Sequence, residues 1–201
     1  MKPWSILLTA LLVTVPVGVA SAEFGTLEET ASSTRQATRL QNATAVSGPQ
    51  PPVSTPELDE QVLVLVNYER TARGLVPLQL DSSLNVAAQG HSSTQAAAGT
   101  IFHNAPDGTN PGDRISKTGY KFSTWGENVA AGFRDAEAVM IAWMESPGHC
   151  RNVLNPAFTE LGVGYVERPD DPSRYFDYWT QVFARPAGVP SPPGVYNPAW
   201  C

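Results

Sequence analysis

The chain has 201 residues, of which 13 are Lys or Arg and 19 are Asp or Glu, so its formal net charge is −6. This length accommodates one domain of ordinary size with additional segments, and 42% hydrophobic residues are enough to form a core. The acidic balance and the lack of a cluster of Lys and Arg exclude nucleic acid as the partner. Composition therefore predicts one globular domain and leaves its activity open.

The first 22 residues have the layout of a secretory signal peptide. Lys2 precedes an apolar stretch over residues 4–15, and residues 20–22 are Ala-Ser-Ala, the small-x-small pattern after which signal peptidase cleaves. Pro16 interrupts an apolar stretch that is already shorter than the ~20 residues needed to span a bilayer, so a membrane anchor is the weaker interpretation. We therefore expect export, with no transmembrane segment after cleavage.

The two cysteines are expected to form a disulfide. Cys150 lies within the patterned part of the chain and Cys201 is the last residue. Exported proteins fold in oxidising compartments, where a pair of cysteines usually bridges. The alternatives are two free thiols, or Cys150 acting as a nucleophile or a metal ligand. A bridge would close a loop of about 50 residues and tie the C-terminal segment to the domain.

Composition divides the rest of the chain into three parts. Residues 23–56 are rich in Ala, Ser, Thr and Pro and have no sustained hydrophobic period, so we expect a flexible linker. Pro and Gly become frequent again over residues 187–201, which we interpret as an irregular tail. The folded domain is therefore predicted over residues 57–186.

Hydrophobic periodicity predicts three helices followed by strands. The first helix begins at Thr55 and Pro56 and is stopped by Gly74, the second runs from Asp81 to Gly99, and the third runs from about Asp135 to the Pro147-Gly148 pair. The alternation over residues 161–166 and 178–183 predicts an antiparallel hairpin, and a third strand includes residues 127–131. This order of elements is typical of an α+β domain built from layers.

The three histidines and one glutamate are candidates for a functional site. His91 lies in the second predicted helix, where a locally hydrogen-bonded histidine is the simpler interpretation. His103 precedes a long loop over residues 104–114 and His149 follows the end of the third helix, so both are expected on loops that present binding groups. Glu127 precedes an apolar strand, and a carboxylate buried there needs a donor, a histidine or a cation beside it.

Seven ordered blocks of residues are more specific than these spacings. They are Phe102-His103 with Pro106-Asp107-Gly108 and Arg114, Gly119-Tyr120, the run from Gly126 to Ala130, the run from Trp143 to His149, the run from Asn152 to Pro156, the run from Glu160 to Gly164, and the run from Tyr178 to Phe183. Together they resemble the CAP superfamily, whose domain is also called the SCP domain and which includes cysteine-rich secretory, antigen 5 and pathogenesis-related 1 proteins. The order and spacing are most similar to its short, cysteine-poor bacterial branch.

The resemblance implies an α-β-α sandwich, in which a small antiparallel sheet lies between helical layers and a cleft opens on one side. In this family two histidines and two glutamates converge in the cleft and can hold a divalent cation such as zinc. The matching positions are His103, Glu127 and His149, as cleft residues and metal ligands. Glu145 is a candidate for the fourth position only because it lies near His149 in the sequence. The resemblance assigns no catalytic residue.

The function implied by the resemblance is that of a secreted, non-enzymatic binding module, and we expect the protein to be a monomer. Its ligand would be a small hydrophobic molecule, such as a sterol or a fatty acid, or a cell-surface component. One alternative is a metal-dependent secreted peptidase or esterase, with Glu127 or Glu145 as general base. Against it, the sequence has neither a Gly-x-Ser-x-Gly elbow nor a zincin motif. Another alternative is a structural module of the cell wall or surface. The exported protein is expected in the medium, a periplasm or a wall.

Overall fold

The structure, a computed structural model, describes residues 57–201. The predicted signal peptide and linker, and the predicted helix start at Thr55 and Pro56, lie outside the described residues. The elements follow in the order α2 (Leu58–Thr71), β1 (Gln79–Leu80), α3 (Ser82–Ala98), α4 (Pro111–Lys117), β2 (Phe122–Ala131), α5 (Ala136–Glu145), α6 (Pro147–Val153), β3 (Glu160–Glu167), β4 (Asp177–Pro186) and a short 3₁₀ helix η1 (Pro198–Trp200).

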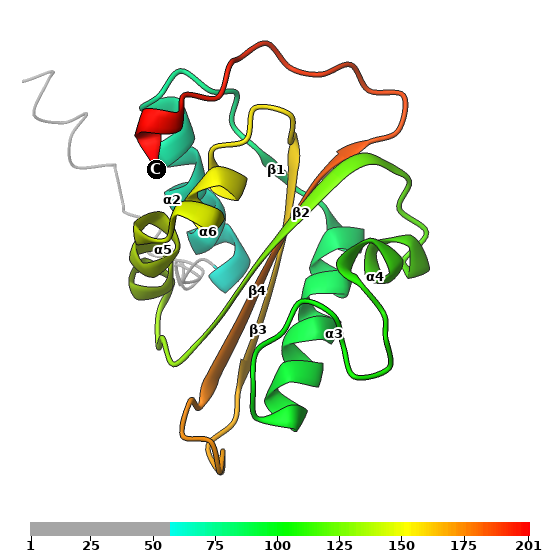
Figure 1. Ribbon diagram of the computed structural model, residues 1–201, viewed down its shortest axis with the longest axis vertical. Coiled ribbons are helices and arrows are strands. Elements are labelled where there is room, and N and C mark those ends of the chain that lie inside the picture. Colours follow the sequence, from blue (N-terminus) through cyan, green and yellow to red (C-terminus); the bar gives the residue numbers. More distant parts are fainter. Residues whose placement is uncertain (1–56) are drawn as a thin grey trace, which may run out of the picture. The chain divides into compact units, whose positions relative to one another are not determined.

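A four-stranded sheet lies between two helical layers (Figure 1). Helices α3 and α4 cover one face, and α2, α5 and α6 cover the other. The strand order is β1-β3-β4-β2, and neighbouring strands are antiparallel except for the parallel pair β1 and β3. The predicted α-β-α sandwich is confirmed. The parallel pair was not predicted, because a strand of two residues has no detectable period.

The side chains of β4 alternate between the two faces of the sheet and contribute to the hydrophobic core on each face. Trp179 and Phe183 belong to the core that packs against α2, α5 and α6. Val182 and Ala184 belong to the smaller core that packs against α3 and α4. Because successive side chains of a strand point to opposite faces, one central strand is buried on both sides. The functional residues of β2, at the edge of the sheet, follow the same alternation.

Helix α3 packs directly on the backbone of β3, because β3 has glycine at two positions that face the helix. A Cβ atom added at Gly162 would lie 2.1 Å from the carbonyl carbon of Leu84, and one added at Gly164 would lie 2.3 Å from that of Ala88. Leu84 and Ala88 are one helical turn apart, so the spacing of the two glycines matches the repeat of the helix.

We expect the variant Gly164→Ala to lower the free energy of unfolding by about 1–3 kcal/mol, because the added methyl group meets helix backbone that cannot move without shifting α3. Urea denaturation measures this change. Gly90→Ala is the matched control, since Gly90 lies within α3 and a Cβ atom there has no neighbour within 4 Å. That substitution should be neutral or stabilising. Equal midpoints for the two variants would contradict the close contact.

The ends of α3 agree with the sequence prediction. The side chain of Asp81 accepts hydrogen bonds from the backbone N–H groups of Ser83 and Leu84 and so caps the first turn. Gly99 closes the helix with a φ angle of +68°, in the left-handed region. Both ends are therefore determined by residues adjacent to the helix.

The prediction of a loop over residues 104–114 was wrong at its end, where α4 begins. Asn110 and Asp113 form a capping box, in which each side chain accepts a hydrogen bond from the backbone N–H of the other. Pro111 occupies the first helical position, where its missing N–H group has no role. The same proline that suggests a loop is therefore compatible with the start of a helix.

The predicted loop position of His149 was also wrong. Helix α5 ends at Glu145 as expected, but Pro147 begins α6 and places His149 in its first turn. Proline interrupts a helix that precedes it and is tolerated in the first turn of the helix that follows. His149 is therefore held on a helix that packs against the sheet.

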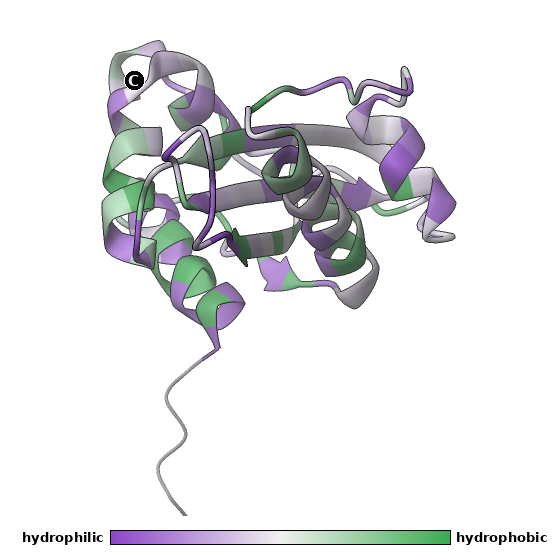
Figure 2. Ribbon diagram, turned by 90° about the horizontal axis from the view of Figure 1, so that it is seen from below, coloured by the Kyte–Doolittle hydropathy of each residue, from purple (hydrophilic) through white to green (hydrophobic). Residues whose placement is uncertain are grey.

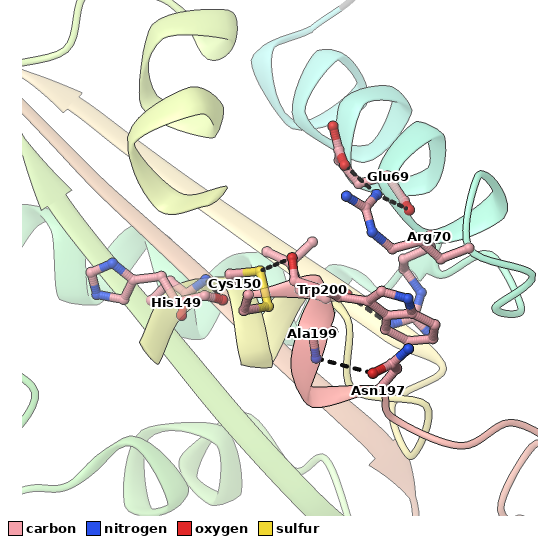
Figure 3. The surroundings of a disulfide bond; sticks show 11 residues. Glu69, Arg70, His149, Cys150, Asn197, Ala199 and Trp200 are labelled. Carbon is pink, nitrogen blue, oxygen red and sulfur yellow. Dashed lines mark hydrogen bonds and ion pairs between the residues drawn. A yellow bond between two sulfur atoms is a disulfide. The ribbon is translucent and has the colours of Figure 1, made fainter. Parts of the chain in front are cut away.

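The C-terminal tail returns to the domain through the predicted disulfide. Cys150 and Cys201 are bonded, with their Cα atoms 5.8 Å apart, which confirms the pairing (Figure 3). Tyr196 and Trp200 pack against the larger core, to which Cys150 belongs. Cys150 is fully buried and bonded, so it offers neither a free nucleophile nor a metal ligand.

Candidate functional site

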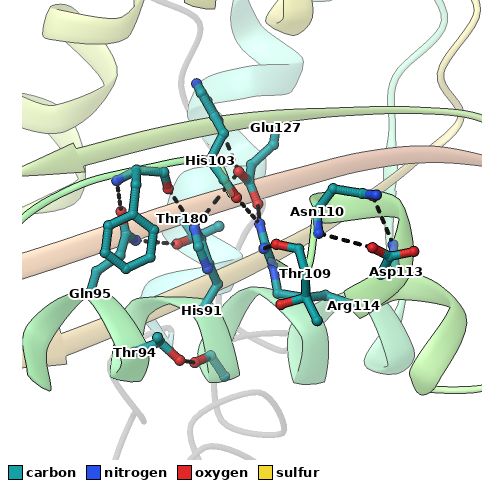
Figure 4. A network of polar contacts seen from close by, with 12 residues as sticks. His91, Thr94, Gln95, His103, Thr109, Asn110, Asp113, Arg114, Glu127 and Thr180 are labelled. Carbon is teal, nitrogen blue, oxygen red and sulfur yellow. Dashed lines mark hydrogen bonds and ion pairs between the residues drawn. The ribbon is translucent and has the colours of Figure 1, made fainter. Parts of the chain in front are cut away.

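The carboxylate of Glu127 is the centre of a polar network on the face of the sheet that α3 covers (Figure 4). Its side chain is 1% exposed. One oxygen, Oε1, lies 2.9 Å from Nδ1 of His103 and 3.8 Å from Nε2 of His91. The other, Oε2, accepts a 2.6 Å hydrogen bond from Nη2 of Arg114. A buried carboxylate requires such partners, and here Arg114 also supplies the opposite charge.

Four different parts of the chain supply these side chains. Glu127 comes from β2, His91 from the buried face of α3, His103 from the connection between α3 and α4, and Arg114 from α4. Arg114 also donates hydrogen bonds to the carbonyl oxygens of His103, at 2.9 Å, and of Thr109, at 3.1 Å. One guanidinium group therefore fixes the connecting loop and neutralises the carboxylate.

The neighbouring side chain of β2 attaches α6 to the site. Asn128 points to the other face of the sheet, and its Nδ2 donates to the carbonyl oxygen of His149 at 3.1 Å. Nδ2 of Asn152 donates to Oδ1 of Asn128 at 2.8 Å and to the carbonyl oxygen of Glu127 at 3.0 Å. These bonds hold the first and last turns of α6 against β2. The half-buried imidazole of His149 points away from the disulfide (Figure 3).

The pKa values of the three histidines are shifted in different directions. The hydrogen bond to Glu127 raises the pKa of His103 above its ordinary value, although partial burial opposes this. Burial lowers the pKa of His91, and burial together with the charge of His103 lowers the pKa of His149. Nε2 of His91 lies 2.7 Å from the carbonyl oxygen of Phe102, which can only accept, so Nε2 carries the proton of the neutral ring. The buried Nδ1 of His91 then has no partner in the described chain.

We expect a proton NMR titration to give His103 a pKa above 6.5 and His149 a pKa below 6.5. Glu127→Gln removes the charge that favours the imidazolium ion and should return the pKa of His103 toward 6.5, whereas the control Glu145→Gln should leave it unchanged. Because the folded-state pKa of His103 is raised, its contribution to stability is complete below pH 6.5 and is lost as the pH rises through that folded-state pKa. A His103 pKa that is the same in both variants would contradict the contact with Glu127.

Beside this network lies a cleft with a volume of about 500 Å³. Its wall is formed by the side chains and backbone of His103, Asn104, Asn110, Pro111, Trp125, Gly126, Glu127 and Asn152. The imidazole of His103 is 54% exposed and Trp125 is 38% exposed, so both are open to a ligand. Three amides, one imidazole and one indole therefore present hydrogen-bonding groups and an aromatic surface.

Of the four predicted cleft residues, the structure brings His103 and Glu127 into contact. His149 lies on α6, where its backbone carbonyl accepts a hydrogen bond from Asn128; its imidazole forms no hydrogen bond with Glu127 or His103 in the described chain, although the charge of His103 lowers its pKa. Glu145 lines a different cavity, between α2 and α5. Sequence proximity to His149 does not bring Glu145 to the cleft, because α6 begins a new helix between them.

The contacts of Glu127 also indicate whether the side chains around it could bind a metal ion. Both oxygens of Glu127 are hydrogen-bonded, one of them to a guanidinium ion whose charge opposes a cation. Within residues 57–201 no group of three or more His, Cys, Asp or Glu side chains is arranged to hold a metal ion. As they lie, these residues do not fit a preformed zinc centre, which usually has at least three protein ligands.

Sequence reasoning assigned no role to Arg114 and favoured a local role for His91. Arg114 was present in the first block of the family resemblance, but its pairing with Glu127 depends on α4, which was not predicted. His91 follows Leu84 and Ala88 on the buried stripe of α3, at helical spacing. That stripe is the signal that would have placed His91 against the sheet and so near the carboxylate.

Comparison with known proteins establishes the family. The model of the CAP family, described as the cysteine-rich secretory protein family, matches residues 63–183. The chain therefore belongs to the CAP family, as the sequence blocks indicated. The cleft beside Glu127 is formed by residues within the matched range.

Relatives with similar sequences include bacterial proteins. The chain is 35% identical over 163 residues to the Bacillus subtilis (strain 168) protein YkwD, covering 81% of this chain and 60% of YkwD. It is 32% identical over 127 residues to the membrane protein YlbC of the same organism, covering 63% of this chain and 34% of YlbC. The match thus spans less than two thirds of either relative.

Solved structures confirm the fold. An extracellular protein containing an SCP domain from Bacillus anthracis has a TM-score of 0.56 at 32% identity, over 69% of this chain and 45% of that one. An outer surface protein from Borrelia burgdorferi has a TM-score of 0.58 at 24% identity, over 63% of this chain and 91% of that one. These neighbours are extracellular or surface proteins. Between residues 57 and 201, no helix is both long and apolar enough to cross a bilayer.

Proposed function

We propose that this protein is an exported, non-enzymatic binding module whose cleft beside Glu127 recognises a polar component of a cell surface. The chemistry of the cleft wall is the observation that carries the proposal. Asn104, Asn110 and Asn152 offer amide donors and acceptors around the exposed ring of Trp125. Amides that fix orientation beside an aromatic surface are typical of sites for polar ligands with an apolar face, such as sugars.

The same wall argues against a sterol or a fatty acid in this cleft. Its apolar members are Pro111, Trp125 and the backbone of Gly126, with no aliphatic side chain of Val, Leu, Ile or Met among its lining residues in the described chain. Asn110 and Asn152 already form hydrogen bonds within the protein. A sterol or an acyl chain would cover their remaining polar atoms and the amide of Asn104 without offering a hydrogen bond, at a cost of about 1–3 kcal/mol for each unsatisfied group. Of the two ligand classes that the family resemblance implies, a polar cell-surface component is therefore favoured over a small hydrophobic molecule.

The state of Glu127 supports binding over hydrolysis. A general base must lie within hydrogen-bond reach of the proton that it removes, and the side chain of Glu127 is only 1% exposed. Both carboxylate oxygens of Glu127 already accept hydrogen bonds, and Arg114 stabilises their negative charge. His103, whose pKa is raised by Glu127, is instead suited to donate a hydrogen bond from its exposed side.

Binding to an array of cell-surface glycans tests the proposal. We expect Trp125→Ala to weaken binding more than tenfold, because a central aromatic side chain often contributes about 2 kcal/mol or more. Tyr175→Ala is the matched control, since Tyr175 has a similar exposure of 42% and lies on the loop between β3 and β4. Equal binding by both variants would overturn the proposal, as would recovery of lipid in place of glycan from this cleft.

The contacts of Glu127 argue against the zinc ion that the family resemblance implies. Elemental analysis of natively purified protein beside a His103→Ala, His149→Ala double variant tests it. Given the engaged carboxylate, we expect no stoichiometric metal in either protein. One equivalent of zinc in the native protein that disappears in the double variant would show that the cleft rearranges to accept the ion.

A further inference from the structure

A second concave surface lies between α2 and α5, away from the Glu127 cleft. Two cavities of about 460 and 530 Å³ adjoin there and share Leu65 and Glu137 as walls. Large apolar side chains beside them are open to solvent: Val64 is 67% exposed, Tyr68 70% and Ile141 59%. We call this surface the α2–α5 groove. Exposed apolar side chains gathered around a concave surface are typical of an interaction site.

The floor of the groove is adaptable. Met140 and Met144 line it from α5 and Trp200 lines it from the C-terminal segment. Methionine has a flexible, polarisable side chain that adjusts to the shape of a partner, and it is frequent at surfaces that bind apolar helices. Figure 2, coloured by hydropathy, shows hydrophobic and hydrophilic residues alternating along the helices of this layer.

The rim of the groove is predominantly acidic. Glu60, Glu69, Glu137 and Glu145 line the two cavities. Arg73, the one cationic lining residue in the described chain, is bound to Glu69 at 2.5 Å. The carboxylates of Glu60, Glu137 and Glu145 form no ion pair with any residue between 57 and 201. Three uncompensated negative charges therefore surround an apolar floor.

The acidic rim and the apolar floor indicate which kind of partner the groove could bind. A fatty acid would bring its own carboxylate to an acidic rim, and a second copy of the chain would oppose one acidic rim to another across a two-fold axis. A basic, amphipathic partner matches both features, because it buries apolar side chains on the floor and places ammonium or guanidinium groups at the rim. Helical partners of this kind present apolar residues one turn apart.

We propose that the α2–α5 groove is a docking site for a cationic amphipathic helix of a partner protein. The apolar side of that helix packs on Leu65, Tyr68 and Ile141, and its basic side chains pair with Glu137 and Glu145. The site is separate from the Glu127 cleft, whose wall includes the start of α4 and shares no residue with the groove.

A model peptide tests the proposal directly. The probe is a fluorescent amphipathic helix of Leu and Lys, about five turns long, and the control peptide has Glu in place of Lys. By fluorescence anisotropy we expect the Lys peptide to bind at least tenfold more tightly than the Glu peptide. We expect its affinity to fall as the salt concentration rises, since ion pairs at an exposed rim are screened. Equal binding of the two peptides would overturn the proposed charge selection.

Two pairs of variants separate the groove from the net charge of the protein. Glu137→Lys with Glu145→Lys should weaken binding more than tenfold. Glu167→Lys with Asp170→Lys, the same charge change at exposed residues near the loop between β3 and β4, should leave binding within twofold. If both double variants lose affinity equally, the peptide recognises net charge and no groove site exists.

The apolar part is tested by Val64→Ser with Ile141→Ser. Both side chains are mostly exposed, so the variant should unfold at the same temperature as the parent protein while binding the Lys peptide at least tenfold more weakly. Unchanged affinity would remove the apolar floor from the proposal. Displacement of the peptide by oleate with a matching affinity for oleate itself would reassign the groove to a lipid.

Discussion

Arg70→Met is expected to lower the free energy of unfolding by about 3–5 kcal/mol, because several backbone carbonyl groups lose their donor at about 1–3 kcal/mol for each one that stays buried and unsatisfied. Arg70 is fully buried within α2. Its guanidinium group donates hydrogen bonds of 2.8–3.2 Å to the carbonyl oxygens of Val76, Val153, Asn155 and Phe158. Methionine fills a similar volume but leaves these four carbonyl groups without their donors.

The charge of Arg70 is stabilised by carbonyl groups, since it forms no ion pair with a carboxylate between residues 57 and 201. Burial lowers the pKa of Arg70 to about 10, so the group is still charged at neutral pH. Val153 is the last residue of α6, and the carbonyl groups at this C-terminus form the negative end of the helix dipole. Arg70 thereby joins α2 to the segment between α6 and β3, and the end of α6 stabilises its charge.

Urea denaturation of two control variants separates this network from the loss of any arginine. Arg73→Met removes an arginine of the same helical region whose ion pair with Glu69 is partly exposed, and it should cost less than about 1 kcal/mol. Arg70→Lys keeps the charge and part of the hydrogen bonding, so its loss should be intermediate. If Arg70→Met were as stable as Arg73→Met, the buried guanidinium would not hold these segments together.

The sequence predicted elements whose signals lie within a short window. The hairpin of β3 and β4 alternates over each strand, and α3 has its N-cap residue and its terminal glycine directly beside the helix. The two short helices α4 and α6 were missed because each begins with proline, a residue that also interrupts helices. Seven residues contain about two turns, too few for a hydrophobic period to stand out from the surrounding loop.

Only part of the candidate site could be predicted from the sequence, and the physical reason differs from that for the short helices. Its contacts join residues that are far apart in sequence, such as His103 and Glu127, and no local pattern records them. The family resemblance supplied that pair. The resemblance did not predict the hydrogen bond from Arg114 to Glu127, which compensates the negative charge of the carboxylate. The chemical character of the cleft therefore depends on a tertiary contact that the sequence alone left unassigned.

Removal of the disulfide, by Cys150→Ala with Cys201→Ala, should lower the free energy of unfolding by about 4 kcal/mol. The bond joins residues separated by 51 positions, and in the chain-entropy model its main effect is to restrict the unfolded chain. Denaturant midpoints of the double variant and the parent protein measure the loss. A reducing agent under denaturing conditions should produce the same change in the parent protein and none in the variant.

The disulfide also makes a local prediction that distinguishes it from a purely global constraint. Trp200 packs against the core beside Cys150, whereas most residues from 187 to 197 are exposed. Without the bond, the tail is held mainly by the contacts of Tyr196 and Trp200, so limited proteolysis should cleave residues 187–197 faster while the domain stays intact. Faster cleavage with an unchanged midpoint would restrict the role of the bond to anchoring the tail. An unchanged midpoint with unchanged cleavage would show that packing alone holds the C-terminal segment.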